Sequence, residues 1–375
     1  MSPTQPPRPR GLRLSATISI YIARQFSMWF FSLLGAVLTI VFLVSVVDLL
    51  DRLSSRENVT FGLVVEMAAL RLPFYSQEIM PFLVLGAGMF TFWRLTRSNE
   101  LVVARAAGVS VWQFLLPVIG AALIFALVTI ALINPIGTTL LSRFNYLEGR
   151  HLRNQESALT VAKAGIWLRQ ADEKGQSVIH ALRGEEESMT LYDVIVFRFI
   201  GSDNFDSRID AQSAQLKNGS WVLNKLWLTR PGAPPKFVES MEIKTELTPE
   251  KILDSFAPPE SISFWSLPGF IDLLENAGFS AQRHRLQLHK LLAMPALFTA
   301  MVLLAAAFSM RNQRHGKVSF SILSGVLSAF LLYFLSNFVY ALGLSEKIPV
   351  VLAAWTPSGV SLALGAATLL HLEDG

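Results

Sequence analysis

Long apolar runs fill most of the chain and are separated by short polar segments, apart from one extended polar region in the middle. A membrane-spanning helix needs about 20 mostly apolar residues, because the hydrocarbon core of a bilayer is about 30 Å thick. Several runs without Asp, Glu, Lys or Arg reach that length, and one more does so if Glu66, Arg71 and Glu78 are tolerated. The six predicted spans cover residues 25–48, 62–93, 110–134, 290–310, 319–343 and 349–371.

The polar middle region, residues 135–288, has the pattern of β-strands. Asn218-Gly219 stands between two mostly apolar runs, residues 209–216 and 221–229, which is typical of a hairpin with a type I′ turn. Short runs separated by turn residues favour an antiparallel sandwich, a jellyroll-like fold or a barrel-like fold. Further predicted strands are residues 159–168, 177–182, 191–200 and 236–246.

These two patterns predict an α-helical membrane protein with six transmembrane helices and an all-β, jellyroll-like periplasmic domain inserted between helices 3 and 4. Residues 1–134 form an N-terminal membrane half with three spans. Residues 135–288 form the β domain with its connecting segments, and residues 289–375 form a C-terminal membrane half with three spans. The composition supports a membrane protein, because only 16% of the residues are charged, whereas soluble domains carry about 25%.

The distribution of basic residues predicts the orientation of the chain, because cytoplasmic loops carry an excess of Lys and Arg. The N-terminal tail and the loops after the second and fourth spans together hold ten basic residues and one acidic residue, Glu100. The short loops on the other side are balanced in charge. We therefore expect both termini in the cytoplasm and residues 135–288 in the periplasm.

The residue patterns of common active sites and metal centres are missing from the sequence. The six histidines form no His-Glu-x-x-His pair, and no Gly-x-Ser-x-Gly turn is present. The absence of cysteine excludes disulfides and thiolate metal sites. We expect a non-catalytic protein that binds no metal or cofactor directly, so its energy must come from a partner or from an ion gradient.

Three charged residues in the second span, Glu66, Arg71 and Glu78, have two interpretations. Charges at bilayer depth are costly and usually functional, so these side chains could line a cavity for an amphiphilic or anionic substrate. Alternatively, this part of the span begins at the outer membrane interface, where long side chains reach the water. The sequence alone leaves both interpretations open.

The loop after the second span, residues 97–108, is predicted to form a short helix. Ser98 or Asn99 can cap it, Glu100 suits the positive N-terminal end of a helix, and Gly108 ends it. Its small and apolar side chains could dock into a groove of another protein. An ordinary helix at the membrane surface is the alternative.

The same loop resembles a known family. Residues 98–108 resemble the Ser-Glu-Leu-Val-Val-x-x-Ala-x-Gly segment of LptF/LptG permeases, the paired membrane subunits of the lipopolysaccharide export ABC transporter. The resemblance covers nearly the whole chain, including Pro73 and Pro81 and the order of three spans, β domain and three spans. Residues 164–167 and 247–251 resemble the G-type subunit more closely than the F-type subunit.

The resemblance implies a permease subunit that extracts lipopolysaccharide from the Gram-negative inner membrane and passes it through its periplasmic β domain toward the outer membrane. It implies a homodimeric LptB-like cytoplasmic ATPase, which uses the ATP, and a second, LptF-like permease with six spans. It also implies LptA/LptC-like proteins as the periplasmic bridge and the membrane-anchored accessory. No nucleic acid is expected as a partner.

The family also implies roles for individual residues. Its loop-helix glutamate meets the ATPase, which assigns ATPase coupling to Glu100, with Leu101 and Arg105 beside it. Spans one and five form a lateral gate in the family. The candidate residues for gating or close packing in span five are Gly325, Ser328 and Asn337.

Substrate contacts are expected at the outer end of span one, where basic residues of the family contact phosphates. The fit is partial, because Ser45 and Asp51 stand where lysines are expected and only Arg52 matches. The apolar positions in the β domain are candidates for acyl-chain contact. The full set of candidate substrate-binding residues is Arg52, Arg56, Arg71, Arg143, Ile166, Leu168 and Phe197.

Two other functions remain alternatives. A mechanotransmitting ABC subunit would couple cytoplasmic ATP hydrolysis to a periplasmic partner without moving lipid. A lipid-transporting β domain should form an apolar trough, whereas a signalling domain should have a packed core and one binding face. An intramembrane enzyme of lipid assembly is disfavoured, because paired acids or histidines are missing from the spans.

Overall fold

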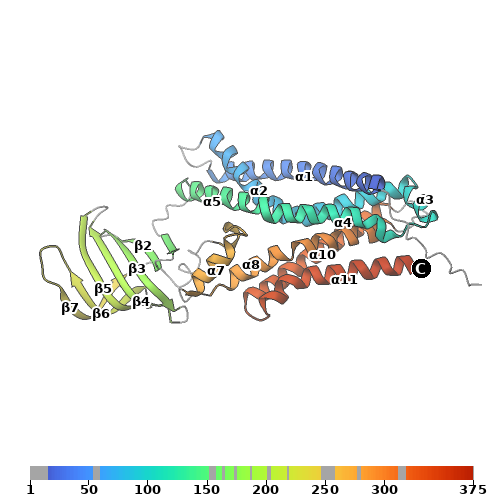
Figure 1. Cartoon of the computed structure of the whole chain (residues 1–375). Coiled ribbons are helices and arrows are strands. Elements are labelled where there is room, and N and C mark those ends of the chain that lie inside the picture. The colour runs from blue at the N-terminus through green and yellow to red at the C-terminus, as the bar shows by residue number, and fades with distance from the viewer. Residues whose placement is uncertain are drawn as a thin grey trace, which may run out of the picture. The chain divides into compact units, whose positions relative to one another are not determined.

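The computed structural model divides the chain into two compact units, and each is described by itself (Figure 1). The helical unit comprises Met1–Gly137 and His289–Gly375, and the β unit comprises Thr138–Leu288. The residues that the structure describes are 16–53, 60–151, 158–162, 165–172, 175–185, 188–200, 204–217, 219–245, 258–276, 280–310 and 318–374.

The helical unit is built from long apolar helices. Among the described residues, five helices are long and apolar enough to cross a membrane, and the pair α8–α9, bent by 46°, makes a sixth if it is counted as one span. This agrees with the six predicted spans. The helices are α1 (Ala16–Leu53), α2 (Phe61–Arg97), α3 (Glu100–Ala106), α4 (Val111–Val128), α5 (Asn134–His151), α8 (Gln282–Leu292), α9 (Met294–Ser309), α10 (Val318–Leu344) and α11 (Val350–Asp374).

The central helix of this unit is α9, which packs against α2, α4, α10 and α11. All side chains in residues 300–307 are buried. Small residues bring the neighbouring backbones close, since a Cβ atom at Gly365 of α11 would lie 2.7 Å from the Cβ of Leu303. Lipid tails are as apolar as leucine, so close packing of this kind holds membrane helices together.

In the part of the β unit that the structure describes, seven strands form one antiparallel sheet, in which sheet neighbours are also sequence neighbours. The predicted all-β insertion is confirmed. The predicted strand over residues 159–168 is wrong in one respect, because this segment contributes to two strands that pair with each other, with Ala162 opposite Gly165. The strands are β1 (Ala158–Ala162), β2 (Gly165–Asp172), β3 (Gly175–Glu185), β4 (Thr190–Ile200), β5 (Asn204–Lys217), β6 (Ser220–Thr229) and β7 (Lys236–Lys244).

The strands bend at one level of the sheet. Asp193 of β4 (φ 54°) and Lys225 of β6 (φ 48°) both have left-handed backbone conformations there. Such a residue interrupts the regular alternation of side chains between the two faces of a strand. The side chains on either side of Asp193 and Lys225 therefore bury the same face of the sheet. The two flanking rows of buried side chains are Val194–Ala211–Leu226 and Leu191–Ala214–Leu223.

The sheet also curls. The side-chain amide of Gln170 on β2 donates to the carbonyl of Lys244 at the end of β7 (3.3 Å), and the hydroxyl of Thr245 donates to Gln170 Oε1 (2.7 Å). Four strands separate β2 from β7 in the sheet order. These hydrogen bonds therefore require the sheet to curl until β2 reaches the end of β7.

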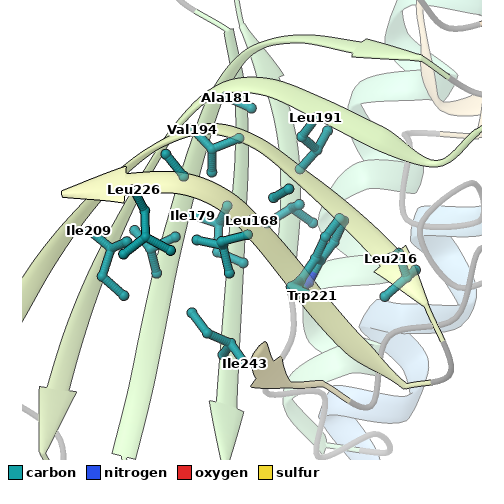
Figure 2. Packing of buried hydrophobic residues seen from close by; sticks show 14 of the residues in the cluster. Leu168, Ile179, Ala181, Leu191, Val194, Ile209, Leu216, Trp221, Leu226 and Ile243 are labelled. Atoms are coloured by element: carbon teal, nitrogen blue, oxygen red, sulfur yellow. The ribbon is translucent and has the colours of Figure 1, made fainter. Parts of the chain in front are cut away.

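The inner face of the curled sheet holds the core of the β unit (Figure 2). Its largest member is Trp221, 2% exposed, which lies among aliphatic side chains from β2 to β7. Helix α7 (Leu267–Asn276) contributes Ile271 and Leu274 to the same cluster. The inner face is therefore packed by side chains of the sheet together with those of α7.

Candidate functional site

The short helix predicted between the second and third spans is present as α3. Helix α2 ends at Arg97, Asn99 adopts a left-handed conformation (φ 59°), and α3 begins at Glu100. The hydroxyl of Ser98 donates to Glu100 Oε1 at 2.8 Å. This hydrogen bond holds the carboxylate in the first turn of the helix, where the helix dipole favours a negative charge.

The side chains of α3 divide into an inward and an outward set. Leu101 is buried, whereas Val102 and Val103 are 53% and 68% exposed. Leu101 therefore anchors α3 to the helical unit, and the two valines together with exposed Glu100 form its outward surface. The side chain of Arg105, also predicted to act here, lies outside the described residues.

The α3 end of the unit is tied to α1 by a hydrogen bond. Arg94, on the last turn of α2, donates to Gln25 Oε1 of α1 at 2.6 Å, and the Gln25 side chain is buried. The guanidinium of Arg97 lies 5.4 Å from the Trp93 ring centroid. The Arg94–Gln25 hydrogen bond therefore joins α1 to the end of α2 that precedes α3.

A layer of polar side chains crosses the helical unit far from α3. Asn134 donates to Gln77 Oε1 (3.0 Å), and Lys290 of α8 donates to Glu78 Oε1 (3.3 Å). At 1.5 Å per helical residue, Glu78 lies about 28 Å along α2 from Arg97, which is close to the thickness of a hydrocarbon core. The layer therefore lies about one hydrocarbon thickness away from the Arg97 end of α2.

A π-helical segment, η1 (Thr129–Ile133), connects α4 to α5 near the polar layer. It leads directly into Asn134, and Thr129 donates to the carbonyl of Phe125 (2.7 Å). A Cβ atom at Gly137 would lie only 2.8 Å from Gln77 Nε2, so α5 approaches α2 closely here. The Gln77–Asn134 contact thus joins α2 to the start of α5.

This layer bears on the charges in α2. Arg71 lies about 10 Å and Glu66 about 18 Å beyond Glu78, counted along the helix axis away from α3. Both positions therefore lie more than one hydrocarbon thickness from Arg97 along α2, and the Arg71 guanidinium lies 5.0 Å from the Tyr75 ring centroid. The geometry favours the interpretation of these charges as interfacial.

The predicted substrate-binding arginines that the structure describes belong to different helices. Arg52 forms an exposed ion pair with Asp48 on its own helix (3.0 Å), and Arg71 belongs to α2. Arg143 is an exposed residue of α5 in the β unit. Arg56 lies outside the described residues.

The predicted acyl-contact positions of the β unit lie on both faces of the sheet. Leu168 is buried on the inner face, opposite Ile179. Phe197 is half-buried on the outer face, where the Arg208 guanidinium lies 5.8 Å from its ring centroid. Leu168 and Phe197 therefore cannot line one groove, and the side chain of Ile166 lies outside the described residues.

Exposed side chains on the strands of the β unit form ion pairs and hydrogen bonds with one another. Arg183 pairs with Asp193 (3.5 Å). The Tyr192 hydroxyl donates to Glu185 Oε2 at 3.2 Å, and this hydrogen bond, together with the charge of the carboxylate, raises the pKa of Tyr192. Among the described residues, no group of His, Asp or Glu side chains could hold a metal ion.

The candidate gate residues of α10 occupy different surroundings. Gly325 is buried against Met89 of α2, and a Cβ atom there would lie 2.6 Å from Met89 Cε. Ser328 is half-buried and Asn337 is exposed. Gly325 thus allows close packing between helices of this chain.

Sequence reasoning missed Lys290 and the Gln77–Asn134 pair. Lys290 stood at the edge of a predicted span, where a lysine is unremarkable. Its partner Glu78 is 212 positions away in the sequence. Only the position of Glu78 beside an apolar run indicated that it needs a partner.

Comparison with known proteins gives a family match over almost the whole chain. The family described as lipopolysaccharide export system permease LptF/LptG matches residues 20–371. The Escherichia coli K12 lipopolysaccharide export system permease protein LptG is 24% identical over 297 residues, covering 76% of this chain and 78% of that protein. The Haemophilus influenzae LptG is 22% identical over 338 residues, covering 87% and 92%. The chain therefore belongs to the LptF/LptG family of lipopolysaccharide export system permeases.

Proposed function

We propose that this chain is the G-type permease subunit of an ABC transporter that extracts lipopolysaccharide from the inner membrane and passes it through the β unit toward the outer membrane. The observation that carries the proposal is the family match over residues 20–371. The chain itself is non-catalytic, and an LptB-like homodimeric ATPase on the cytoplasmic side drives it. An LptF-like permease completes the membrane part, and LptA/LptC-like proteins receive the lipid.

In this function, α3 is the contact for the ATPase. It presents Glu100, Val102 and Val103 on its outward surface while Leu101 fixes it to the helical unit. The bond between Arg94 and Gln25 offers a route from α3 to α1. The proposal therefore assigns the α3 end to the cytoplasm and the β unit to the periplasm, in agreement with the distribution of basic residues.

Co-purification tests the proposed assembly directly. An affinity tag on the full-length chain should recover an ATPase and a second six-span permease from detergent-solubilised membranes. Recovery of the chain alone under conditions that keep it monodisperse would contradict the proposal.

The substitution Glu100→Lys should lower ATP-driven lipopolysaccharide export by about tenfold or more, because it reverses the charge at the proposed interface. Stability should change by less than about 0.5 kcal/mol, since the side chain is exposed. Export in spheroplasts and thermal stability in detergent measure the two effects. Glu346→Lys, an exposed acid in the loop after α10, is the matched control and should export normally. Normal export and normal ATPase recovery in Glu100→Lys would reject the coupling role.

A photo-reactive amino acid at Val238 should capture lipopolysaccharide in an ATP-dependent way, because Val238 lies at the partly exposed margin of the inner face, opposite Leu226. The same probe at the adjacent Phe237, 49% exposed and therefore on the outer face, should not. The two positions differ by one residue, so strand alternation alone separates them. Equal capture at both positions would show that lipid does not follow the inner face.

One observation favours the alternative of a mechanotransmitting subunit. The inner face of the sheet is filled by its own side chains and by Ile271 and Leu274 of α7, as expected of a packed core. In that function the β unit would transmit ATP-driven motion to a periplasmic partner without opening. Lack of capture at Val238 in an actively exporting strain would support it.

A further inference from the structure

Helix α10 is attached to its neighbours along a narrow stripe. It packs against α11 and α9 and meets α2 at few places. Much of its remaining surface consists of exposed apolar side chains. These include Leu323, Val326, Leu327, Phe330, Leu331, Phe334 and Phe338.

Among the contacts that connect α10 to α2 and α8 in the described residues, three lie one above another along the helix. Nearest to α3, Met89 lies against Gly325. In the middle, the rings of Phe82 and Tyr333 are 5.7 Å apart. The third contact is polar, because the Lys290 ammonium lies 5.6 Å from the Tyr340 ring centroid while it is bonded to Glu78 (3.3 Å).

The polar contact differs physically from the two apolar ones. In a bilayer, an apolar side chain loses little when it exchanges a neighbouring helix for a lipid tail, so the Phe82–Tyr333 contact adds little specificity. A lysine held against an aromatic ring gains electrostatic energy that lipid tails do not supply. Tyr340 lies four residues before the end of α10 at Leu344, and the Lys290 side chain is 46% exposed, so the partners of this contact can also exchange with water.

Lys290 also lies beside a break in its own helix. The axis turns by 46° between α8, which ends at Leu292, and α9, which begins at Met294. Helix α9 is buried in the middle of the helical unit, whereas α8 begins in the β unit at Gln282. A change in the bend would move Lys290 relative to α10 while α9 stays packed.

We propose that Lys290 is a positioning residue. Its ammonium group is bonded to Glu78 of α2 and lies against the Tyr340 ring, and in this way it holds the end of α10 beside α2. The three side chains form a latch that opens when α10 moves away from α2 during transport. The role in transport rests on the proposed function, whereas the fastening of α10 does not.

Distance measurements between spin labels test the latch. The chain has no cysteine, so Ala69→Cys on α2 and Leu344→Cys on α10 introduce unique labelling sites. The full-length chain in lipid nanodiscs should show one dominant distance. Lys290→Met keeps most of the apolar stem but removes the charge, and it should raise the ratio of a longer-distance population to the dominant one about fivefold.

Variants of the other two members separate the latch from a general structural effect. Glu78→Gln and Tyr340→Leu should produce the same longer-distance population as Lys290→Met. Tyr340→Phe keeps the ring and should behave like the parent chain. Lys347→Met is the matched control, because it removes an exposed lysine just beyond the same end of α10, and it should leave the distances unchanged.

Two results would overturn the proposal. The first is an unchanged distance distribution in both Lys290→Met and Tyr340→Leu. The second is full recovery of the dominant distance when Glu78→Lys and Lys290→Glu are combined, because that pair restores the ion pair while placing a carboxylate at the Tyr340 ring. Neither measurement needs lipopolysaccharide or ATP. A failed latch therefore leaves the proposed function intact, and failure of co-purification leaves the latch to be judged by the distances.

Discussion

Gly365→Leu should strongly destabilise the folded helical unit. A Cβ atom at this position would lie 2.7 Å from Leu303 Cβ and 3.4 Å from the backbone nitrogen of Leu304. Both atoms belong to the central helix α9, so neither can swing aside as the end of a flexible side chain could. We expect α11 to separate from α9 at a cost of about 3 kcal/mol or more.

The measurement is size-exclusion chromatography of the detergent-solubilised protein after heating. The apparent melting temperature should fall by about 10 °C, or the monodisperse peak should be lost. Gly359→Leu is the matched control on the same helix, because a Cβ atom there would meet no atom within 4 Å. Similar melting temperatures for the two variants would show that α9 and α11 do not pack as closely as described.

Trp221→Ala should destabilise the β unit by about 3–5 kcal/mol, the range for truncating a fully buried aromatic residue. Trp221 is 2% exposed and belongs to the cluster shared by the sheet and α7. Its indole N–H has no hydrogen-bond partner among the described residues, so the expected loss is one of apolar packing. Trp221→Phe should therefore cost much less than Trp221→Ala.

Hydrogen exchange of the full-length protein in detergent gives the local stability of this unit. Protection of peptides from β4, β5 and β6 should fall about a hundredfold or more in Trp221→Ala. Trp227→Ala on the same strand is the control, since Trp227 is 51% exposed on the outer face. Loss of protection in both variants to the same degree would contradict the assignment of the inner face.

The number and position of the apolar helices could be predicted from the sequence, because a membrane span requires a long run without charges. The second span also shows the limit of that rule. Its three charges could not be interpreted from the sequence, and the structure shows that one of them, Glu78, is paired with Lys290 of α8. Depth depends on how helices are aligned with one another, and local sequence does not contain that alignment.

The β unit also combines features that could be predicted from the sequence with features that could not. The Asn218-Gly219 turn and the apolar runs around it predicted the β5–β6 hairpin, because turn chemistry is local. The curl of the sheet was not predictable, since it depends on Gln170 meeting Lys244 and Thr245 from the far end of the domain. The pairing of β1 with β2 was also missed, because the run over residues 159–168 is mostly apolar and was read as one continuous strand.

Within the candidate site, α3 and Glu100 were predictable, while their orientation was not. Cap residues and the helix-ending glycine act within a few positions of the helix, so the sequence predicts that the helix exists. The same motif did not indicate that Leu101 would be buried and Val102 and Val103 exposed. That choice depends on which side of α3 meets the other helices.

The sequence by itself determined the elements whose causes are local: apolar runs of membrane length, alternating strands, and the cap and turn residues that end them. The tertiary structure alone decided which of those elements touch. It packed the small residues of α2 and α11 against α9 and joined Glu78 to Lys290 across 212 positions. The physical reason is that side-chain packing and ion pairing act over a few ångströms in space, so these contacts exist only after distant segments have been brought together.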